Sequence, residues 1–332
     1  MPNSIPKMYS TKYHDQDLSN LNFLITGGAG FIGSHIVEYL LQYGAGKVRV
    51  LDNLSTGFQA NVDMFIHHPN YEFMLGDIRE LNDCKNAVEG MDYVLHQAAL
   101  GSVPRSINDP LTTHAVNSTG FLNILWAVKE NGGVKRFIYA ASSSTYGDSK
   151  ELPKVEERIG KPLSPYAITK FNNEQYADVF GKTYGLQHIG LRYFNVFGPR
   201  QSSDGAYAAV IPLFIKAVKE GKPAYINGDG EQTRDFTFIE NAVQANIKAA
   251  LTTNENALNT VYNVACGERT SLNELWKMVN EIAGTSIVPF YRDGREGDIR
   301  DSLAEIKKAQ NELNYNNLIN LKEGMLIMIK IN

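Results

Sequence analysis

The sequence predicts an α/β fold, a doubly wound parallel sheet of the Rossmann type with a smaller mixed α/β lobe toward the C-terminus. Three observations predict it. Short apolar runs alternate with segments of helical periodicity, a glycine-rich turn joins the first run to the first helix, and the alternation loosens beyond about residue 193. The length of 332 residues also exceeds what one hydrophobic core usually supports, which favours one large domain with a smaller one attached.

The first strand and helix are the clearest elements. Residues 21–26 (LNFLIT) form a short apolar run that ends in glycines, and residues 31–44 have helical spacing closed by Gly44. A helix over about residues 111–129 follows later. The further apolar runs are KVRVLD, YEFMLGD, MDYVLHQAA, VKRFIYAAS and LQHIGLRYF. Strands that are apolar throughout and separated by helices predict a parallel sheet covered on both faces.

The second half begins with a well-marked helix start, because Ser164 can cap a helix whose first residue is Pro165. Beyond it we expect a helix over residues 210–219, a short strand in AYING, and a helix in FIENAVQANIKAAL that returns to the first domain. The predicted organisation is an N-terminal extension (1–20), a cofactor domain (21–192 plus about 235–266) and a substrate lobe (about 193–234 plus 267–332).

Composition excludes several classes of function. The chain is 43% hydrophobic and 20% charged with a net charge of −4, so neither nucleic acid nor an anionic membrane is expected as the main partner. Cys84 and Cys266 are the two cysteines, too few for a disulfide framework or a zinc site, and we expect no metal. The first 20 residues lack a signal-peptide core, and no apolar run reaches the roughly 18 residues of a membrane span. A cytoplasmic protein is predicted.

The stretch TGGAGFIG places Gly27, Gly30 and Gly33 between the first strand and the first helix. There, backbone N–H groups and the positive end of the helix dipole face one point, which suits a pyrophosphate. The spacing alone is a weak signal in a chain with 28 glycines, and the glycines could serve only a tight turn. Asp52 strengthens the prediction, because it ends the second strand where an adenosine ribose would lie.

The acid at position 52 also selects the cofactor. A carboxylate there repels a 2′-phosphate, and DNLSTG offers no Arg or Lys to offset it, so NAD is favoured over NADP. Asp77 follows the third strand, and Gln97, Ala98 and Ala99 follow the fourth. The small residues would let a cofactor approach the backbone, but either group taken alone could be structural.

A tyrosine and a lysine four residues apart occur three times in the sequence. Only Tyr166 and Lys170 fall on a capped helix, where this spacing places both side chains on one face. The other two pairs enclose turns: Tyr43 with Lys47, and Tyr146 with Lys150.

In hydride chemistry with NAD, the phenol of Tyr166 would have to accept a proton, and so act as a base, near pH 7. A free phenol titrates near pH 10. The difference of about three pKa units corresponds to roughly 4 kcal/mol. The ammonium of Lys170 and the positive nicotinamide ring both favour phenolate, and Lys170 would also bind ribose hydroxyls. The alternative is an exposed aromatic residue beside a solvated lysine.

Serines follow the fifth predicted strand and would face the same site. A hydroxyl there can hydrogen-bond the substrate oxygen that gains or loses a proton. Ser142 is the first candidate for this role and Ser143 the second, whereas Ser144 could simply cap the following turn.

With these residues assembled, the chain resembles an extended short-chain dehydrogenase/reductase, specifically a nucleotide-sugar 4-epimerase, over roughly residues 22–304. It is most similar to bacterial UDP-N-acetylglucosamine 4-epimerases of surface-polysaccharide synthesis. The resemblance is carried by QAALGSVPRSINDP, ASSSTYGD, LSPYAITK, LRYFNVFGPRQ, INGDGEQTRDF and REGDIRDSLA. It departs at the C-terminus, where LINLKEGMLIMIKIN lacks the usual aromatic ending and stops early.

The resemblance implies a reaction without net redox change. Tightly bound NAD removes hydride from carbon 4 of the sugar while the tyrosine takes the hydroxyl proton; the keto-sugar then rotates about its diphosphate, and hydride returns to the opposite face. It also implies a homodimer formed through the long helices near Leu111 and Tyr166.

The resemblance also assigns residues. Tyr193 would lie by the nicotinamide, Asn117 near the active-site end of the cofactor, and Asn195 at the UDP phosphates. Arg234 and Arg295 would neutralise the diphosphate, although without the resemblance they read equally well as surface charges. Asp298 would hold the uridine ribose. The other implied residues are Phe31, Ile32, Asn53 and Ile78 for the cofactor, and Gly101, Ser102, Val210, Tyr225, Asn227 and Ser302, with Ser142, Ser143 and Tyr166, for the substrate.

Two small residues bear on the sugar. Relatives restricted to unacetylated hexoses often have Lys at position 101 and Tyr at position 302, whereas this chain has Gly101 and Ser302, which leave room for an N-acetyl group. UDP-GlcNAc and UDP-GalNAc are therefore the predicted pair, with UDP-glucose and UDP-galactose secondary.

Three rival functions remain at this point. A 4,6-dehydratase would have Asp and Glu where Ser143 and Ser144 stand. A UDP-uronic acid epimerase or decarboxylase needs a site for the sugar carboxylate. An NAD-sensing module of the same fold would lack the tyrosine that this chain has at position 166.

Overall fold

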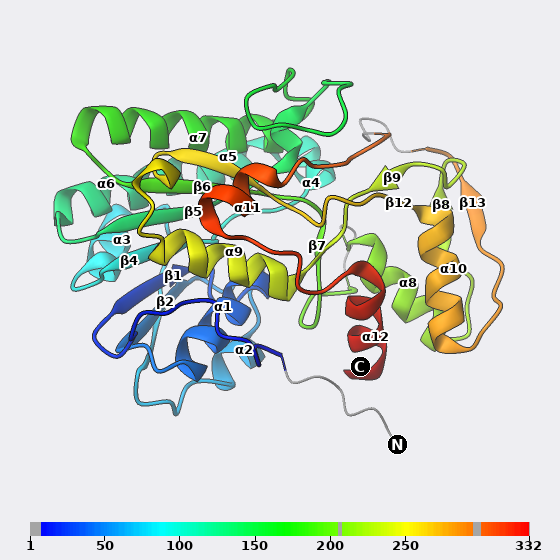
Figure 1. The fold of residues 1–332 in the computed structure, drawn as a ribbon, viewed down its shortest axis with the longest axis horizontal. Coiled ribbons are helices and arrows are strands. Elements are labelled where there is room, and N and C mark those ends of the chain that lie inside the picture. The colour runs from blue at the N-terminus through cyan, green and yellow to red at the C-terminus, as the bar shows by residue number, and fades with distance from the viewer. Residues whose placement is uncertain (1–7, 205–207, 295–299, 332) are drawn as a thin grey trace.

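The computed structural model describes residues 8–204, 208–294 and 300–331, and it is organised around one seven-stranded sheet. The strand order is β11-β6-β5-β4-β1-β2-β3, and every neighbouring pair is parallel (Figure 1). The strands are β1 (Asn22–Thr26), β2 (Lys47–Asp52), β3 (Tyr71–Leu75), β4 (Tyr93–His96), β5 (Arg136–Ser142), β6 (His188–Tyr193) and β11 (Thr260–Val264). The predicted fold class is confirmed; the seventh strand, β11, was not among the predicted elements.

The centre of the sheet is apolar on both faces, as the continuous hydrophobic runs predict. Ile25 of β1 pairs with Val50 on one side and with Leu95 on the other, and all three side chains are fully buried. The strand order reverses between β1 and β4, which creates a crevice at their carboxyl ends. The glycine turn follows β1 at this crevice.

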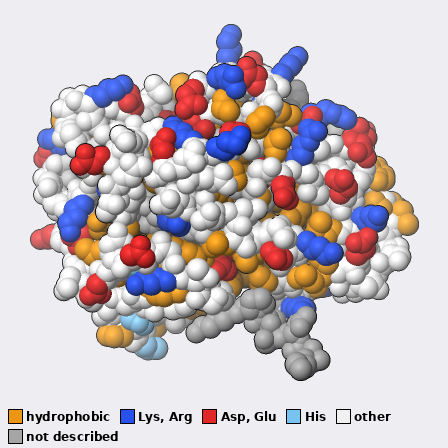
Figure 2. Space-filling view, viewed as in Figure 1, with side chains coloured by type: hydrophobic (Ala, Val, Ile, Leu, Met, Phe, Trp, Pro, Cys, Tyr) orange, Lys and Arg blue, Asp and Glu red, His pale blue; other side chains and the backbone are white. Residues whose placement is uncertain are grey.

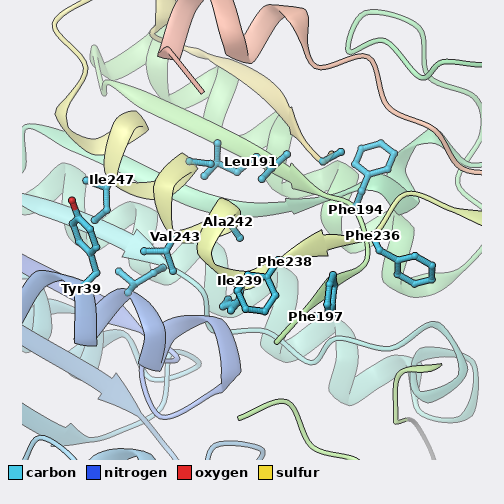
Figure 3. Close-up of a cluster of buried hydrophobic side chains, with 14 of the residues drawn as sticks. Tyr39, Leu191, Phe194, Phe197, Phe236, Phe238, Ile239, Ala242, Val243 and Ile247 are labelled. Carbon is cyan, nitrogen blue, oxygen red and sulfur yellow. The ribbon is translucent and has the colours of Figure 1, made fainter. Parts of the chain in front are cut away.

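Helices cover both faces of the sheet. On one face, α1 (Phe31–Gln42) packs against α9 (Ile239–Leu251). Figure 3 shows Tyr39 of α1 and Val243 and Ile247 of α9 within this core. The other face carries α3 (Leu81–Val88), α6 (Gly120–Asn131) and α7 (Pro165–Tyr184), whose apolar side chains form a second cluster.

The predicted helix near residues 111–129 consists of several pieces. It begins as α5 (Pro110–His114), passes through a π-helical turn (Ala115–Thr119) and continues as α6. The π turn was not predicted, since it depends on contacts made by this turn with other segments. Before it, α4 (Val103–Asn108) is capped by Ser102, whose hydroxyl accepts a hydrogen bond from the N–H of Arg105.

Helix α7 begins as its sequence predicts. The hydroxyl of Ser164 accepts a hydrogen bond from the N–H of Ala167 at 3.1 Å, and Pro165 is the first helical residue. The helix ends at Gly185, which adopts a left-handed conformation. This cap fixes the register that places positions 166 and 170 on the inner face.

The remaining elements lie mainly in the C-terminal half, on the right of Figure 1. These elements are α8 (Val210–Lys219), β8 (Tyr225–Asn227), β9 (Thr233–Arg234), β12 (Thr270–Ser271), α10 (Leu272–Ala283), β13 (Phe290–Arg292), α11 (Lys307–Leu313) and α12 (Leu321–Ile331). Helix α8 occupies the predicted range and packs against α10, and α10 packs against α12, so the atypical C-terminus still forms a packed helix. The short elements are α2 (Gln59–Asp63), β7 (Val196–Phe197), β10 (Thr237–Phe238) and two 3₁₀ turns (Ser143–Tyr146 and Glu255–Ala257). The domain boundaries given above stay a prediction.

The surface agrees with the nearly balanced composition. Acidic and basic side chains are interspersed over the face shown in Figure 2, without one large field of a single sign. Within the described ranges, no helix is both long enough and apolar enough to span a membrane.

Candidate active site

A cleft of about 640 Å³ lies at the carboxyl ends of the central strands. It brings together residues that follow six strands of the sheet, β1 to β6, and residues of α1 and α7. The predicted residues that line it are Gly27, Gly30, Phe31, Ile32, Gly33, Asp52, Asn53, Asp77, Ile78, Gln97, Ala98, Ala99, Gly101, Ser142, Ser143, Tyr166, Lys170, Tyr193 and Asn195. Their individual roles stay predictions, but the cleft collects most of the predicted set.

The glycine turn is too tight for side chains. Gly27 has a φ of +71°, and a Cβ at this position would lie 2.6 Å from the backbone nitrogen of Ala98. A Cβ on Gly33 would lie 2.2 Å from the carbonyl oxygen of Gly27. Because α1 begins at Phe31, its first N–H groups have no acceptor within the helix and open toward the cleft. This arrangement suits an anionic group such as a pyrophosphate.

Asp52 is buried at the end of β2 and is oriented by its neighbours. Its carboxylate accepts one hydrogen bond from the N–H of Ala29 at 3.0 Å and another from the N–H of Leu54 at 2.8 Å. Each oxygen uses one lone pair and keeps a second, which a ribose hydroxyl could occupy. Burial raises the pKa of Asp52, although these two hydrogen bonds lower it.

Asp77 is held by two side chains at the next strand end. It accepts a hydrogen bond from the amide of Asn53 at 2.8 Å and forms an ion pair with Arg79. The guanidinium of Arg79 holds the pKa of Asp77 at about 2, so the carboxylate stays ionised. Asn53 and Asp77, both predicted at the cofactor, thus form one hydrogen-bonded unit.

Three side chains close a ring of hydrogen bonds at the ends of β4 and β6. The phenol of Tyr193 donates to Gln97 at 3.0 Å and accepts from Asn246 at 2.7 Å, and the amide of Gln97 donates to Asn246 at 3.0 Å. Asn246 lies on α9 and is fully buried. Asn246 was not predicted, because no local pattern links position 246 to positions 97 and 193. The ring fixes the hydroxyl of Tyr193, so this phenol is poorly placed to exchange protons with a substrate.

Tyr166 and Lys170 lie one turn apart on α7, with the ammonium nitrogen of Lys170 5.9 Å from the centroid of the tyrosine ring. Lys170 is 3% exposed and donates a hydrogen bond to the carbonyl oxygen of Ala140 at 2.7 Å. Burial lowers the pKa of Lys170 to about 8, although Glu174 raises it. Burial also raises the pKa of Tyr166, and a hydrogen bond with Ser142 lowers it.

Ser142 stands beside this pair at the end of β5. Its hydroxyl oxygen accepts hydrogen bonds from the N–H and the hydroxyl of Ser144 at 3.1 and 2.9 Å. The proton of Ser142 is therefore left to donate, and donation to the phenol oxygen of Tyr166 is the direction that lowers the pKa of that tyrosine. Ser143 and Ser144 also line the cleft. The side chain that caps the following 3₁₀ turn is that of Ser142 and not that of Ser144, which lies within the turn.

Neither of the other two tyrosine–lysine pairs lies on one face of a helix, as the sequence predicts. Tyr146 is buried and donates a hydrogen bond to Asn263 at 2.6 Å, so it packs in the core. Tyr43 ends α1 and donates to the carbonyl oxygen of Tyr9, and Lys47 begins β2. Neither pair reaches the cleft.

Asn117 was predicted near the active-site end of the cofactor, but it does not line the cleft. It is 1% exposed within the π turn; its side-chain oxygen accepts from the N–H of Leu100, and its amide donates to the carbonyl oxygen of Leu100. Asn117 therefore fixes the backbone of Leu100, which does line the cleft.

Several predicted substrate residues lie in the smaller lobe, outside the lining of this cleft. Arg234 on β9 donates to the carbonyl oxygens of Thr233 and Arg300, and the N–H of Ser302 donates to Thr233. Arg234 and Ser302 thus belong to neighbouring segments, although 68 residues separate them in the chain. Asp301 completes this contact through a hydrogen bond from the hydroxyl of Thr233 at 2.6 Å.

Tyr225 and Asn227 share the short strand β8, and Arg292 of β13 contacts both of them. Its guanidinium donates to Asn227 and lies 5.4 Å from the centre of the Tyr225 ring. Arg292 was not predicted, because β8 and β13 are paired only in the folded chain. Val210 begins α8, and Ser102 caps α4 outside the cleft lining. Arg295 and Asp298 lie outside the described residues.

Comparison with known proteins adds to this geometry. Residues 23–265 match the family model described as the NAD dependent epimerase/dehydratase family. The chain belongs to the NAD-dependent epimerase/dehydratase family. This confirms the prediction that the chain is an extended short-chain dehydrogenase/reductase.

Three relatives illustrate the range of this family. A putative UDP-glucose 4-epimerase of Methanocaldococcus jannaschii is 36% identical over 304 residues, which cover 91% of this chain and 95% of that protein. The UDP-N-acetylglucosamine 4-epimerase from Methanobrevibacter ruminantium M1, solved with UDP-N-acetylmuramic acid, is 38% identical with a TM-score of 0.88, covering 94% of this chain and 97% of that one. The UDP-glucuronic acid 4-epimerase from Bacillus cereus, solved with UDP-glucuronic acid and NAD, is 31% identical with a TM-score of 0.86, covering 93% and 98%.

The cleft of this family member fits NAD, which is the predicted cofactor. The glycine turn provides a cradle that a Cβ would fill, and open N–H groups of α1 face it. Asp52 keeps acceptor capacity for a ribose, and the buried Lys170 lines the same cleft. NAD is therefore the cofactor that these residues would hold.

Proposed function

We propose that the protein is a UDP-sugar 4-epimerase that interconverts UDP-GlcNAc and UDP-GalNAc through a transient 4-keto sugar. The observation that carries the proposal is the joint placement of Tyr166, Lys170 and Ser142 in a cleft that also holds the glycine turn. A binding module would need the turn but not a half-buried tyrosine beside a buried lysine and a buried serine in the same cleft. An enzyme that moves a proton and a hydride needs both the glycine turn and these three side chains.

The protein's own groups account for the proton movement. Tyr166 takes the proton of the hydroxyl on carbon 4, and Ser142 donates a hydrogen bond that supports the phenolate. Lys170, anchored to the carbonyl oxygen of Ala140, supplies a positive charge one helical turn away. When bound, NAD supplies hydride acceptance, hydride return and a positive ring. The proton returns from Tyr166 in the second half, so nothing is oxidised or reduced overall.

The N-acetyl preference is the finer part of the proposal. A Cβ placed on Gly101 would meet no atom within 4 Å, so there is open space beside this position. The M. ruminantium relative named as a UDP-N-acetylglucosamine 4-epimerase supports the same sugar. UDP-glucose with UDP-galactose is the alternative favoured by the M. jannaschii relative, and UDP-glucuronic acid is the alternative favoured by the B. cereus structure.

One experiment tests both the epimerase activity and the preference for one sugar. Purified protein is incubated without added cofactor in parallel tubes with UDP-GlcNAc, UDP-glucose and UDP-glucuronic acid, and anomeric proton signals are followed by NMR. Growth of UDP-GalNAc faster than of the other epimers is the expected result. Faster conversion of another sugar would contradict the N-acetyl preference. No conversion of any sugar, even after NAD is added, would contradict the epimerase proposal.

We also propose a homodimer, with the second copy covering α4, α5 and α7. These helices pack side by side and expose the large apolar side chains of Ile107, Leu111, Ile168 and Val179, of which Leu111 is 82% exposed. Leu163, just before the cap of α7, is exposed as well. Exposed apolar side chains on three helices that contact one another fit a symmetric interface with a second copy. Light scattering on a size-exclusion column should give twice the chain mass, and Leu111→Asp should give monomers. A monomeric wild-type protein would contradict this.

Localisation stays a prediction. Both cysteines are free and buried, and burial raises the pKa of Cys84 and of Cys266 to about 12. Neither thiol is therefore poised for redox chemistry. A reducing cytoplasm remains the compartment that the cysteine content favours.

A further inference from the structure

The segment of residues 8–18 precedes the family-matched region and had no function in the sequence analysis, yet it is packed into the core. Tyr9, Tyr13 and His14 are at most 7% exposed. The ring of Tyr13 stacks on Tyr39 of α1 with centroids 4.9 Å apart, and Tyr9 meets the same ring edge-on at 5.8 Å. A loose terminal extension would not bury three aromatic rings, so this segment is fixed against α1.

The backbone of Tyr9 is held on three sides. Its N–H donates to Glu240 of α9, and its carbonyl oxygen accepts from Gln42 and from Tyr43, both at 2.8 Å. Its φ is +59°, an unfavourable value for a tyrosine that the surrounding contacts maintain. With the backbone fixed, the phenol of Tyr9 is directed at His35 of α1, and the hydroxyl oxygen lies 2.6 Å from the Nδ1 atom.

His35 connects Tyr9 to the loop of residues 199–202. Its Nε2 lies 2.9 Å from the carbonyl oxygen of Pro199, which can only accept, so the neutral ring carries its proton on Nε2. Nδ1 is then an acceptor, and both the hydroxyl of Tyr9 and the guanidinium of Arg200 lie within 2.6 Å of it. Arg200 also forms an ion pair with Glu38 on the next turn of α1.

The loop reached in this way forms part of the cofactor cleft. Arg200, Gln201 and Ser202 line the cleft, as does Phe31 at the start of α1. The guanidinium of Arg200 is engaged by Glu38 and His35, so it joins the loop to α1. A continuous chain of polar contacts therefore runs from the N-terminal segment to the wall of the cleft.

We propose that Tyr9 and His35 are positioning residues that fix the loop of residues 199–202 at the cofactor cleft, so that the N-terminal segment slows the release of NAD. This inference rests on the proposed function only in that NAD occupies the cleft. It gives the extension a role in retaining a cofactor that must stay bound between the two hydride transfers. It also predicts that the effect passes through His35 and Arg200 and not through the rest of the extension.

The first test compares two matched variants of the full-length protein as purified with NAD. Tyr9→Phe deletes the hydroxyl that contacts His35, whereas Tyr13→Phe deletes a hydroxyl that donates to Glu240 at 2.6 Å within the same segment. NAD release after dilution is followed by rapid filtration and quantified by absorbance. Because one hydrogen bond is worth about 1 kcal/mol, we expect Tyr9→Phe to release NAD about 3- to 10-fold faster. Tyr13→Phe should stay within about twofold of the wild type. Equal release rates in the two variants would overturn the proposal.

A second test asks whether the contacts act through one another. Arg200→Met should also speed NAD release, and the double variant Tyr9→Phe/Arg200→Met should release NAD no faster than the more severe single variant, because both break the same chain of contacts. If the double variant instead released NAD faster by the product of the two single effects, the proposal would be overturned. Amide hydrogen exchange provides a second readout, since residues 200–202 should exchange faster in Tyr9→Phe than in Tyr13→Phe. These measurements do not depend on the sugar, so a wild-type protein that epimerises nothing would contradict the proposed function and leave this result intact.

Discussion

Lys170 lies one helical turn after Tyr166, with its ammonium nitrogen 5.9 Å from the centroid of the tyrosine ring. Burial opposes the ionised form of both groups: it lowers the pKa of Lys170 to about 8 and raises the pKa of Tyr166. Glu174 partly offsets the first effect and Ser142 the second. The tyrosine therefore needs additional positive charge in the cleft to act as a base near neutral pH, which fits a site that works only with its cofactor bound.

Tyr166→Phe should remove the proposed proton carrier while leaving the shape of the site intact. We expect turnover of UDP-GlcNAc to fall by about 10²- to 10⁴-fold, with unchanged NAD content and thermal stability. Tyr176→Phe is the matched control, because Tyr176 lies on the same helix but is 39% exposed. Turnover within about threefold of the wild type in Tyr166→Phe would show that another group carries the proton.

Lys170→Met should lower activity and raise stability at the same time. We expect turnover to fall by about 10²-fold, while the NAD-free protein gains a few degrees in Tm at pH 7, because the buried ammonium is unfavourable. The pKa of Lys170 in the folded protein, about 8, lies below the ordinary value of 10.5. Below pH 8 the lysine is charged in both the folded and the unfolded chain, so burial of the charge lowers the stability by its full amount there. The gain should shrink as the pH rises from 8 to 10.5. A Tm that falls at pH 7 would mean that the hydrogen bond to Ala140 outweighs burial.

Ser302→Tyr should narrow the sugar site. If Ser302 leaves room for the acetamido group, kcat/KM for UDP-GlcNAc should fall at least about tenfold, while that for UDP-glucose changes by less than about threefold. Ser302→Ala keeps the small volume and should preserve the preference. Equal losses on both sugars in the tyrosine variant would show that position 302 does not set the size of the pocket.

Gly33→Ala should damage the glycine turn more than Gly30→Ala. A Cβ at position 33 would lie 2.2 Å from a backbone oxygen, whereas at position 30 the nearest atom, the same carbonyl oxygen of Gly27, is 3.1 Å away. Backbone atoms cannot move aside as side chains do, so we expect Gly33→Ala to lose bound NAD and about 3 kcal/mol of stability, and Gly30→Ala to lose less of both. Urea denaturation and NAD content measure the two effects. The reverse ranking would contradict the geometry.

His188→Leu should make the protein less sensitive to acid. Among the described residues, neither ring nitrogen of His188 has a hydrogen-bond partner, and burial lowers its pKa to about 4. Because the unfolded chain binds a proton near pH 6.5 and the folded chain does not, His188 reduces stability progressively from pH 6.5 down to 4, by up to about 3 kcal/mol. The variant should lose less stability over this range in urea titrations. His67→Leu, at an exposed histidine, is the control. Parallel pH profiles for the wild type and His188→Leu would contradict the prediction.

Local patterns in the sequence predicted much of the site. The glycine turn, the strand that ends at Asp52, and the cap at Ser164 depend on residues within a few positions of one another. The pairing of Tyr166 with Lys170 follows from helical spacing once the cap fixes where α7 begins. Backbone geometry over one or two turns determines all of these features, so they can be read without knowing the rest of the fold.

Contacts between distant segments could be decided only by the tertiary structure. Asn246 meets Tyr193 and Gln97 because α9 crosses the ends of β6 and β4, and Asn117 turned out to support Leu100 instead of lining the cleft. The N-terminal segment carries no motif, yet it reaches the cofactor cleft through His35. The sequence thus determined the helix that carries Tyr166 and Lys170 and the glycine turn, whose geometry is local. Which side chains orient them was decided by packing, because such partners are selected by distance in the folded chain and leave no periodic pattern along it.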